Sequence, residues 1–138
     1  MDIFYIDRQF GGAVLVEVEN GIVQNVTNES PKYVGKMIED YKGKTITHLK
    51  EHFEARMKGT YHNVRSLAIV TANNQVEAVK SHVNQAAIQM SDNRNNAEKH
   101  AEIMERWNAL IVEQSAAEAE LNTVRTRIQT EHAYNFKF

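Results

Sequence analysis

Two histidines stand at a spacing that could bind a metal ion. His48 and His52 are four residues apart in a segment predicted to be helical, so both imidazoles would lie on one face. A zinc site would need a third ligand, from His62 or Glu51. The order differs from the His-Glu-x-x-His motif of zinc peptidases, because Glu51 directly precedes the second histidine. Surface histidines at this spacing are common by chance, so we expect no metal and no cofactor.

No motif for phosphate binding or nucleophilic catalysis is present. Gly43-Lys44-Thr45 lacks the upstream glycine of a Walker A loop, because the preceding glycine, Gly35, falls inside a predicted helix. The sequence has no cysteine, which excludes a thiol nucleophile, a disulfide scaffold and Cys-ligated zinc. None of the serines lies in a recognisable nucleophile context. We therefore expect that the protein is not an enzyme.

Charge is distributed unevenly along the chain. Residues 31–66 hold eight Lys or Arg and four acidic residues, a net charge of +4, whereas the whole chain has −2. This excess is small for a dedicated nucleic-acid interface, which usually makes the whole domain basic. We expect a surface for an anion or a protein partner, formed by Lys32, Lys36, Tyr41, Lys42, Lys44, Lys50, Arg56 and Arg65. The alternative is an electrostatically matched surface without a ligand.

The N-terminal residues predict an antiparallel sheet. Residues 2–7 (DIFYID) are aromatic and β-branched, as is typical of a strand. Two further β-rich runs, residues 13–18 and 22–27, flank Asn20-Gly21. Asn-Gly between such runs is the strongest short-range signal for a hairpin, because both residues tolerate the positive φ of a type I′ turn.

Two short helices are expected after this hairpin. Ser30 and the proline that follows it suit the N-cap and first position of a helix that ends at Gly43. A second helix is expected to begin near Thr45 or Thr47 and to stop at Gly59.

A helical hairpin is expected in the second half of the chain. Residues 66–72 suit either a fourth strand or the beginning of a helix, and the spacing of apolar residues by three and four from Ile69 onward favours the helix. The polar cluster at 91–96 predicts a turn, with Asn95 and Glu98 spaced as in a capping box. The alternative is one continuous rod over residues 69–131.

The stretch from Ala97 to Glu131 has a heptad repeat and no Gly or Pro, which is typical of a coiled-coil or bundle helix. We expect Trp107 to be a core anchor. The polar Gln114 either fixes register and oligomer number or lies where the seam is open to solvent. The far end of the stretch needs a partner, either the N-terminal module or a second chain, and we favour oligomerisation. The seam residues are Ile103, Trp107, Leu110, Gln114, Ala117, Leu121, Val124 and Ile128.

Together these patterns predict an α+β fold. A small N-terminal antiparallel β-hairpin sheet with two short helices (residues 1–60) precedes a long, coiled-coil-like helical hairpin with an aromatic tail (residues 61–138), and we expect the two to form one structural unit. The chain has no run of about 18 apolar residues and no basic-then-apolar leader, so we expect a soluble cytoplasmic protein with no membrane partner.

The expected function is binding. We expect a non-catalytic, homo-oligomeric interaction protein, an accessory factor of a bacteriophage or bacterium that occludes or sequesters a target. One alternative is sequestration of a small anionic, nucleotide-like ligand in a Lys/Arg-lined pocket between subunits. Another is nucleic-acid binding through the basic residues 32–65, which we favour less. The expected partners are a second copy of the chain and either another protein or a small anionic ligand.

Overall fold

The computed structural model describes residues 1–8, 13–28, 41–56 and 61–134, with side chains left out at 7–8, 13, 28, 52–56 and 61–63. In chain order the elements are β1 (Asp2–Arg8), β2 (Ala13–Glu19), β3 (Ile22–Asn28), α2 (Ile46–Arg56), β4 (Tyr61–Ser66), α3 (Leu67–Asp92) and α4 (Ala97–His132). The chain forms two compact units. Unit 1 contains residues 1–70 and 125–138, and unit 2 contains residues 71–124. The fold is α+β, as the sequence predicts.

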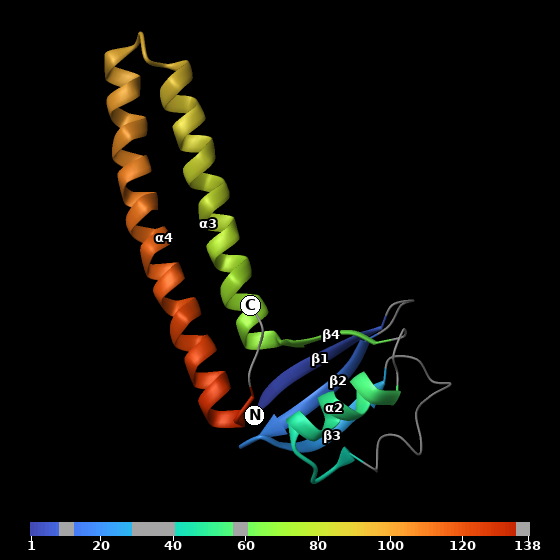
Figure 1. The fold of residues 1–138 in the computed structure, drawn as a ribbon. Helices are drawn as coiled ribbons and strands as arrows, with labels where there is room; N and C mark the ends of the chain where they lie inside the picture. Colours follow the sequence, from blue (N-terminus) through green and yellow to red (C-terminus); the bar gives the residue numbers. More distant parts are fainter. Residues whose placement is uncertain (9–12, 29–40, 57–60, 135–138) are drawn as a thin grey trace. The chain divides into compact units, whose positions relative to one another are not determined.

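Unit 1 is built on a four-stranded antiparallel sheet in the order β3-β2-β1-β4 (Figure 1). The central strand β1 places Phe4 opposite Val16 on one side and opposite Ser66 on the other. Asn20 and Gly21, between β2 and β3, have φ values of 51° and 80°. Because a type I′ turn requires positive φ at both central residues, the predicted hairpin is confirmed.

The fourth strand differs from the sequence interpretation. The sequence suits either a strand or a helix at residues 66–72, with the helix favoured. In the structure α3 begins at Leu67, which confirms the helix. The fourth strand lies earlier, at residues 61–66. No loop separates β4 from α3. The hydroxyl Oγ of Ser66, the last residue of the strand, accepts a hydrogen bond from the Ile69 N–H at 3.4 Å. Ser66 therefore caps the helix that follows it directly.

The core of unit 1 lies on one face of the sheet, because alternate residues of a strand point to the same side. Val14, Val16 and Val18 of β2 are buried there. The expected beginning of α2 near Thr45 is also confirmed, since its Oγ1 accepts the His48 N–H at 3.0 Å. The buried apolar residues are Phe4, Ile6, Val14, Val16, Val18, Val23, Val26, Tyr41, Ile46, Leu49, Val64, Ile69, Ile128 and Tyr134. The expected helix after Ser30 and the expected stop at Gly59 lie outside the described residues.

Unit 2 is a helical hairpin of α3 and α4, which lie side by side and antiparallel (Figure 1). The hairpin is therefore confirmed and the continuous rod is excluded. The cap of α4 is Asn96, whose Oδ1 accepts the Lys99 N–H at 3.2 Å. The sequence interpretation placed this cap one residue too early, at Asn95. Because α4 begins at Ala97, only Asn96 is in the N-cap position.

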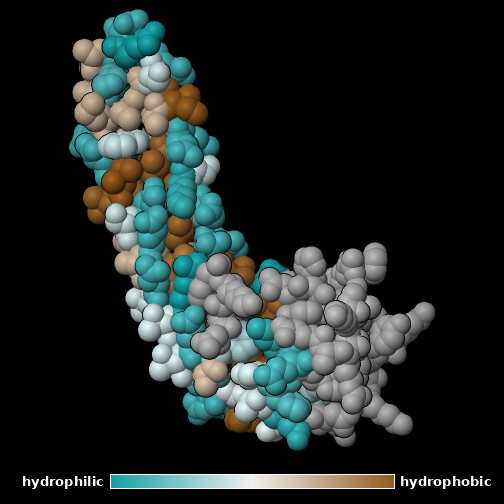
Figure 2. Space-filling model, viewed as in Figure 1, coloured by the Kyte–Doolittle hydropathy of each residue, from teal (hydrophilic) through white to brown (hydrophobic). Residues whose placement is uncertain are grey.

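The two helices of unit 2 bury a single apolar layer between them. Its buried members are Val76, Val79, Val83, Ala86, Ile103 and Leu121. Other apolar side chains stay at the surface, where Figure 2 shows hydrophobic residues interspersed with hydrophilic ones along the hairpin. Among the helices that the structure describes, none combines the length and the apolar character needed to cross a membrane.

Candidate functional site

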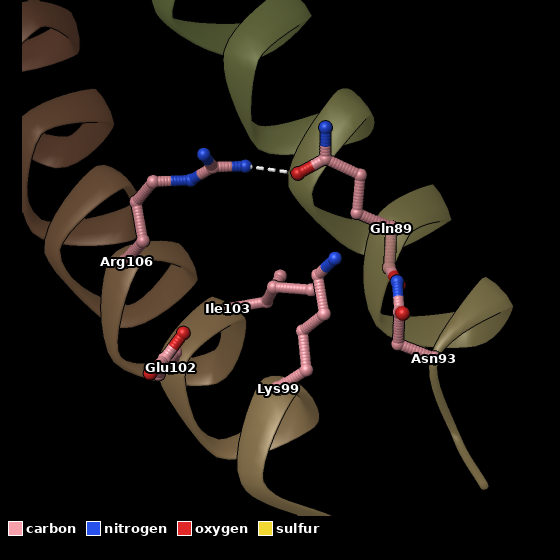
Figure 3. Close-up of a pocket in the computed structure, with 6 residues that line it drawn as sticks. All are labelled: Gln89, Asn93, Lys99, Glu102, Ile103 and Arg106. Carbon is pink, nitrogen blue, oxygen red and sulfur yellow. Dashed lines mark hydrogen bonds between the residues drawn. The ribbon is translucent and has the colours of Figure 1, made fainter. Parts of the chain in front are cut away.

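An open cavity of about 440 Å³, lined mostly by exposed side chains, lies between α3 and α4, near the turn that joins them (Figure 3). Five of its six lining residues have polar side chains, and the lining comes from both sides of the hairpin. The lining residues are Gln89, Asn93, Lys99, Glu102, Ile103 and Arg106. All six belong to unit 2, so the helical hairpin forms this cavity by itself.

Helical spacing brings these side chains together. On α4, Lys99, Glu102 and Arg106 are separated by three and four residues, so they form one stripe. Gln89 on α3 and Asn93, the first residue after that helix, are four residues apart and lie opposite this stripe. The cavity therefore lies where two polar stripes face each other beside the apolar layer of the hairpin.

The guanidinium of Arg106 contacts a side chain of the facing helix. Its Nη2 donates a hydrogen bond to Oε1 of Gln89, which joins the two helices (Figure 3). Asn93 Nδ2 donates to the Gln89 backbone carbonyl at 2.8 Å, so this amide is oriented as well. Because only one Arg106 nitrogen is used in this bond, the other N–H groups can donate to a ligand.

The two remaining charged groups of the cavity have no protein partner among the described residues. The Lys99 ammonium and the Glu102 carboxylate take part in no ion pair or side-chain hydrogen bond there. Figure 3 shows the Lys99 side chain extending toward α3. With Arg106, the lining has two positive charges and one negative charge. Ile103, which is 9% exposed, adds the apolar part of the wall.

This set of groups suits binding better than chemistry. Ammonium and guanidinium groups donate charge-assisted hydrogen bonds to phosphate or carboxylate oxygens. The Glu102 carboxylate and the amide oxygens can accept hydrogen bonds from hydroxyl groups. The lining contains no histidine, serine, threonine or tyrosine, so it offers neither a hydroxyl nucleophile nor an imidazole base.

A second polar cluster joins the two ends of unit 1. Arg127 contacts both carboxylate oxygens of Asp2, at 3.0 and 3.1 Å, and also Glu131 Oε2 at 2.9 Å. The hydrogen bonds from Arg127, together with His132, hold the pKa of Asp2 at about 2, below its ordinary value of 3.8, although desolvation acts in the opposite direction. Burial therefore does not neutralise this carboxylate.

The imidazole of His132 is buried in this cluster and uses both of its ring nitrogens. Nδ1 accepts the backbone N–H of Gly21 at 3.0 Å, and Nε2 lies 2.7 Å from Asp2 Oδ2. The Gly21 bond requires an unprotonated Nδ1, so Nε2 is the protonated nitrogen that donates to Asp2. Neither nitrogen is left to act as a base, so the role of His132 is structural.

A metal ion does not fit this cluster. Ligand atoms of Asp2, Glu131 and His132 lie within 4.8 Å of one another. The guanidinium of Arg127 nevertheless contacts both carboxylates, and it supplies the positive charge that a cation would bring. A metal would also have to displace a hydrogen bond of His132. His48 of the other candidate metal pair is exposed, and the His52 side chain lies outside the described residues.

The basic residues singled out from the sequence lie in unit 1, and none of those described lines the cavity. Tyr41 is buried, so its ring belongs to the core, while Lys42 and Lys44 are exposed. Lys50 Nζ lies 5.3 Å from the ring centroid of Tyr134, and Arg65 lies 5.9 Å from that of Tyr5. Lys32, Lys36 and the side chain of Arg56 fall outside the described residues. A binding surface at these positions stays a prediction.

The heptad seam of α4 is covered by the chain itself over part of its length. Ile103, Leu121 and Ile128 are buried, whereas Trp107, Leu110, Gln114, Ala117 and Val124 are half-buried. Ile128 belongs to unit 1, so the N-terminal module partners the far end of the helix. Trp107 is less buried than a core anchor would be. Gln114 Nε2 donates to Glu118 Oε1 on the same helix at 3.2 Å.

The sequence interpretation missed the cavity residues. The available signal was the polar stripe of Lys99, Glu102 and Arg106, which runs beside the seam and begins next to the predicted turn. Comparison with protein-family models, curated proteins and solved structures finds no match to this chain. A functional assignment therefore rests on the geometry of the cavity and on the exposed surfaces.

Proposed function

We propose that the protein is a non-catalytic binding protein that takes up a small anionic ligand in the cavity at the end of its helical hairpin. The observation that supports this best is the pairing of Lys99 and Arg106 in one cavity of about 440 Å³. This volume falls in the range of small-molecule sites, roughly 300–1,000 Å³.

Uptake without chemistry amounts to sequestration. The cavity offers charge and hydrogen bonds but no hydroxyl nucleophile or imidazole base, so we expect binding to lower the free concentration of the ligand and to leave it intact. This agrees with the accessory role expected from the sequence, in which a cytoplasmic bacterial or bacteriophage protein withholds a target. The basic residues between 32 and 65 are not needed for this function.

The test is binding of anions measured by calorimetry and by thermal shift at low and high salt. We expect a ligand to raise the melting temperature, since binding to the folded state alone stabilises it. Arg106→Ala should weaken binding by roughly tenfold or more, because hydrogen bonds to charged groups contribute about 1.5–3 kcal/mol. Arg94→Ala is the matched control, because Arg94 is exposed beside the turn and does not line the cavity.

Two results would contradict the proposal. One is the absence of binding by any phosphate-bearing or carboxylate-bearing compound at low salt. The other is equal affinity of the wild-type protein and Arg106→Ala, which would place the ligand elsewhere. In the second case, charge reversals at the exposed Lys42 and Lys44 would test the basic surface predicted from the sequence.

A second candidate function, self-association, is favoured by an apolar stripe on α4. Met104 is 43% exposed, and the half-buried Trp107 and Ile111 follow it at spacings of three and four residues. The stripe is offset by five residues from the stripe of Lys99, Glu102 and Arg106, which is a rotation of about 140° at 3.6 residues per turn. A second copy could therefore cover the apolar stripe and leave the cavity open. We propose a homo-oligomer formed in this way.

A further inference from the structure

We infer that unit 1 contains a pH-sensitive connection, in which protonation of His132 releases the turn between β2 and β3 from the end of α4, while the end of α4 stays joined to β1. This inference is independent of the cavity and of the proposed function. It comes from a buried imidazole whose two nitrogens bond to two different parts of the sheet.

The connection to the turn exists only while the ring of His132 is neutral. Nδ1 accepts the Gly21 N–H at 3.0 Å, and an imidazole nitrogen accepts a hydrogen bond only through a free lone pair. A proton on Nδ1 would occupy this lone pair, so two donors would face each other. His132 is 2% exposed and Gly21 is buried, so water can replace the lost acceptor only if the turn moves away.

The connection to β1 survives the same proton. Nε2 of His132 lies 2.7 Å from Asp2 Oδ2 and carries a proton in both states of the ring. Hydrogen bonds from Arg127 hold the pKa of Asp2 at about 2, so its carboxylate stays ionised in mild acid. Protonation of the ring therefore turns this contact into an ion pair, and the end of α4 is retained on β1.

The charges around the ring favour uptake of a proton. Asp2 on β1 and Glu131 on α4 are negative, and Arg127 on α4 contacts both of them, so two negative charges stand against one positive charge. A protonated imidazole would balance this cluster. Burial and the Gly21 bond act in the opposite direction, which couples the proton to release of the turn. Other charged groups on the neighbouring elements are Glu19 at the end of β2 and Lys50 and Glu51 on α2.

The same turn is bonded to the beginning of α2. The Gly21 carbonyl accepts the N–H of Ile46, the first residue of α2, at 2.9 Å. Gly21 therefore contacts α4 through its N–H and α2 through its carbonyl. We expect a movement of the turn to reach α2 through this residue.

The test is nuclear magnetic resonance of the whole protein, isotope-labelled at histidine and at the backbone amides, from about pH 8 to about pH 5, where histidines ordinarily change charge. We expect the His132 Nδ1 resonance to change to that of a protonated nitrogen, and the Gly21 amide resonance to change with the same midpoint. Hydrogen exchange at Gly21, corrected for the intrinsic effect of pH, should become roughly threefold to tenfold faster, as expected for the loss of one hydrogen bond.

The Gly43 amide is the matched control within the same spectrum. Gly43 also has a positive φ, 81°, but its N–H donates to the Val23 backbone carbonyl at 2.9 Å, a group that does not titrate. Its exchange, corrected in the same way, should stay constant over this range. The Ile46 amide should respond with the midpoint of His132.

Two variants separate His132 from other titratable groups. His132→Asn keeps a side-chain oxygen that can accept a hydrogen bond but has no group that titrates, so the pH dependence of exchange at Gly21 should disappear. His82→Asn, at an exposed position of α3, should leave it unchanged. Circular dichroism shows whether each variant is folded, and the titration of the wild-type protein tests the inference without them.

Three results would overturn the inference. The first is a His132 ring that stays neutral over the whole range. The second is protonation of His132 without faster exchange at Gly21. The third is a response of Gly21 that persists in folded His132→Asn, which would assign the pH dependence to another group. Protonation of Asp2 lies well below this range, so it does not contribute to the result.

Discussion

The backbone N–H of Gly21 donates a hydrogen bond to Nδ1 of His132 over 3.0 Å, although the two residues are 111 positions apart in the chain. The bond joins the turn between β2 and β3 to the last turn of α4. The other ring nitrogen, Nε2, donates to Asp2 on β1. One buried imidazole therefore fixes the end of α4 to β1 and to the turn between β2 and β3.

Gly21→Ala should destabilise unit 1 more than Gly43→Ala does. Both glycines have positive φ, 80° and 81°, so both substitutions strain the backbone. A Cβ atom at position 21 would lie 3.0 Å from the His132 carbonyl oxygen, whereas one at position 43 would meet nothing within 4 Å. We expect Gly21→Ala to lower the free energy of unfolding by about 1–2 kcal/mol more in urea denaturation. Equal losses in the two variants would mean that the end of α4 moves away from the added Cβ atom without any loss of stability.

Stability should fall in acid through Asp2. A carboxyl group with a lowered pKa in the folded state contributes stability that is complete above its unfolded pKa, near 3.8, and is lost as the pH falls toward 2. We expect the wild-type protein to lose about 1–2 kcal/mol through Asp2 between pH 4 and pH 2. Urea denaturation across this range should show a smaller loss for Asp2→Asn. Glu19→Gln, at an exposed carboxylate, is the control. An unchanged pH dependence of stability in Asp2→Asn would contradict the assignment of this loss to Asp2.

The N-cap of α4 can be tested by a pair of adjacent substitutions. Asn96→Ala removes the acceptor of the Lys99 N–H and should lower the free energy of unfolding by about 1 kcal/mol. Asn95→Ala changes the neighbouring exposed residue, which is outside the N-cap position, and should have a smaller effect. Thermal or urea denaturation of both variants measures the difference. A larger loss of stability for Asn95→Ala would show that Asn95 is the N-cap of α4, as expected from the sequence.

Self-association should depend on the apolar stripe of α4. We expect light scattering after size exclusion to give a dimer or larger species for the wild-type protein. Met104→Lys combined with Ile111→Lys should give a monomer with unchanged helix content, because charges on the stripe would be buried without partners. Val112→Lys is the control, since Val112 is 70% exposed and lies on another side of α4. A monomeric wild-type protein at all concentrations would exclude the oligomer.

The elements that the sequence predicts well are those with local signals. The type I′ hairpin follows from Asn20-Gly21, and the helical hairpin follows from apolar spacing and the polar cluster at 91–96. The strand β4, residues 61–66 (YHNVRS), was missed because only Val64 in it is aliphatic and no turn residue separates it from α3. Adjacent strand and helix signals of this kind cannot be divided by composition.

The candidate site is harder to predict because it depends on the alignment of two helices. Gln89 and Arg106 are 17 residues apart, and only the register of α3 against α4 brings them into contact. A count of net charge along the sequence points to residues 32–65 and not to the cavity. In α4 the positive charges of Lys99 and Arg106 are cancelled in such a count by neighbouring acidic residues, such as Glu98 and Glu105, that lie on other sides of the helix. Contacts such as Asp2 with His132 leave no local signal at all.

The discontinuity of unit 1 has a consequence for how the protein is made. The chain leaves the sheet at Ser66 and supplies Ile128 and His132 only after the whole helical hairpin has been synthesised. A nascent chain that has released residues 1–70 therefore has an incomplete core, with Phe4 lacking its contacts to His132 and Tyr134. The hairpin forms from contacts between helices adjacent in sequence, which assemble faster than long-range pairings. Folding of the hairpin would thus bring the end of α4 to the sheet, and the core of unit 1 would be completed only after the hairpin has formed.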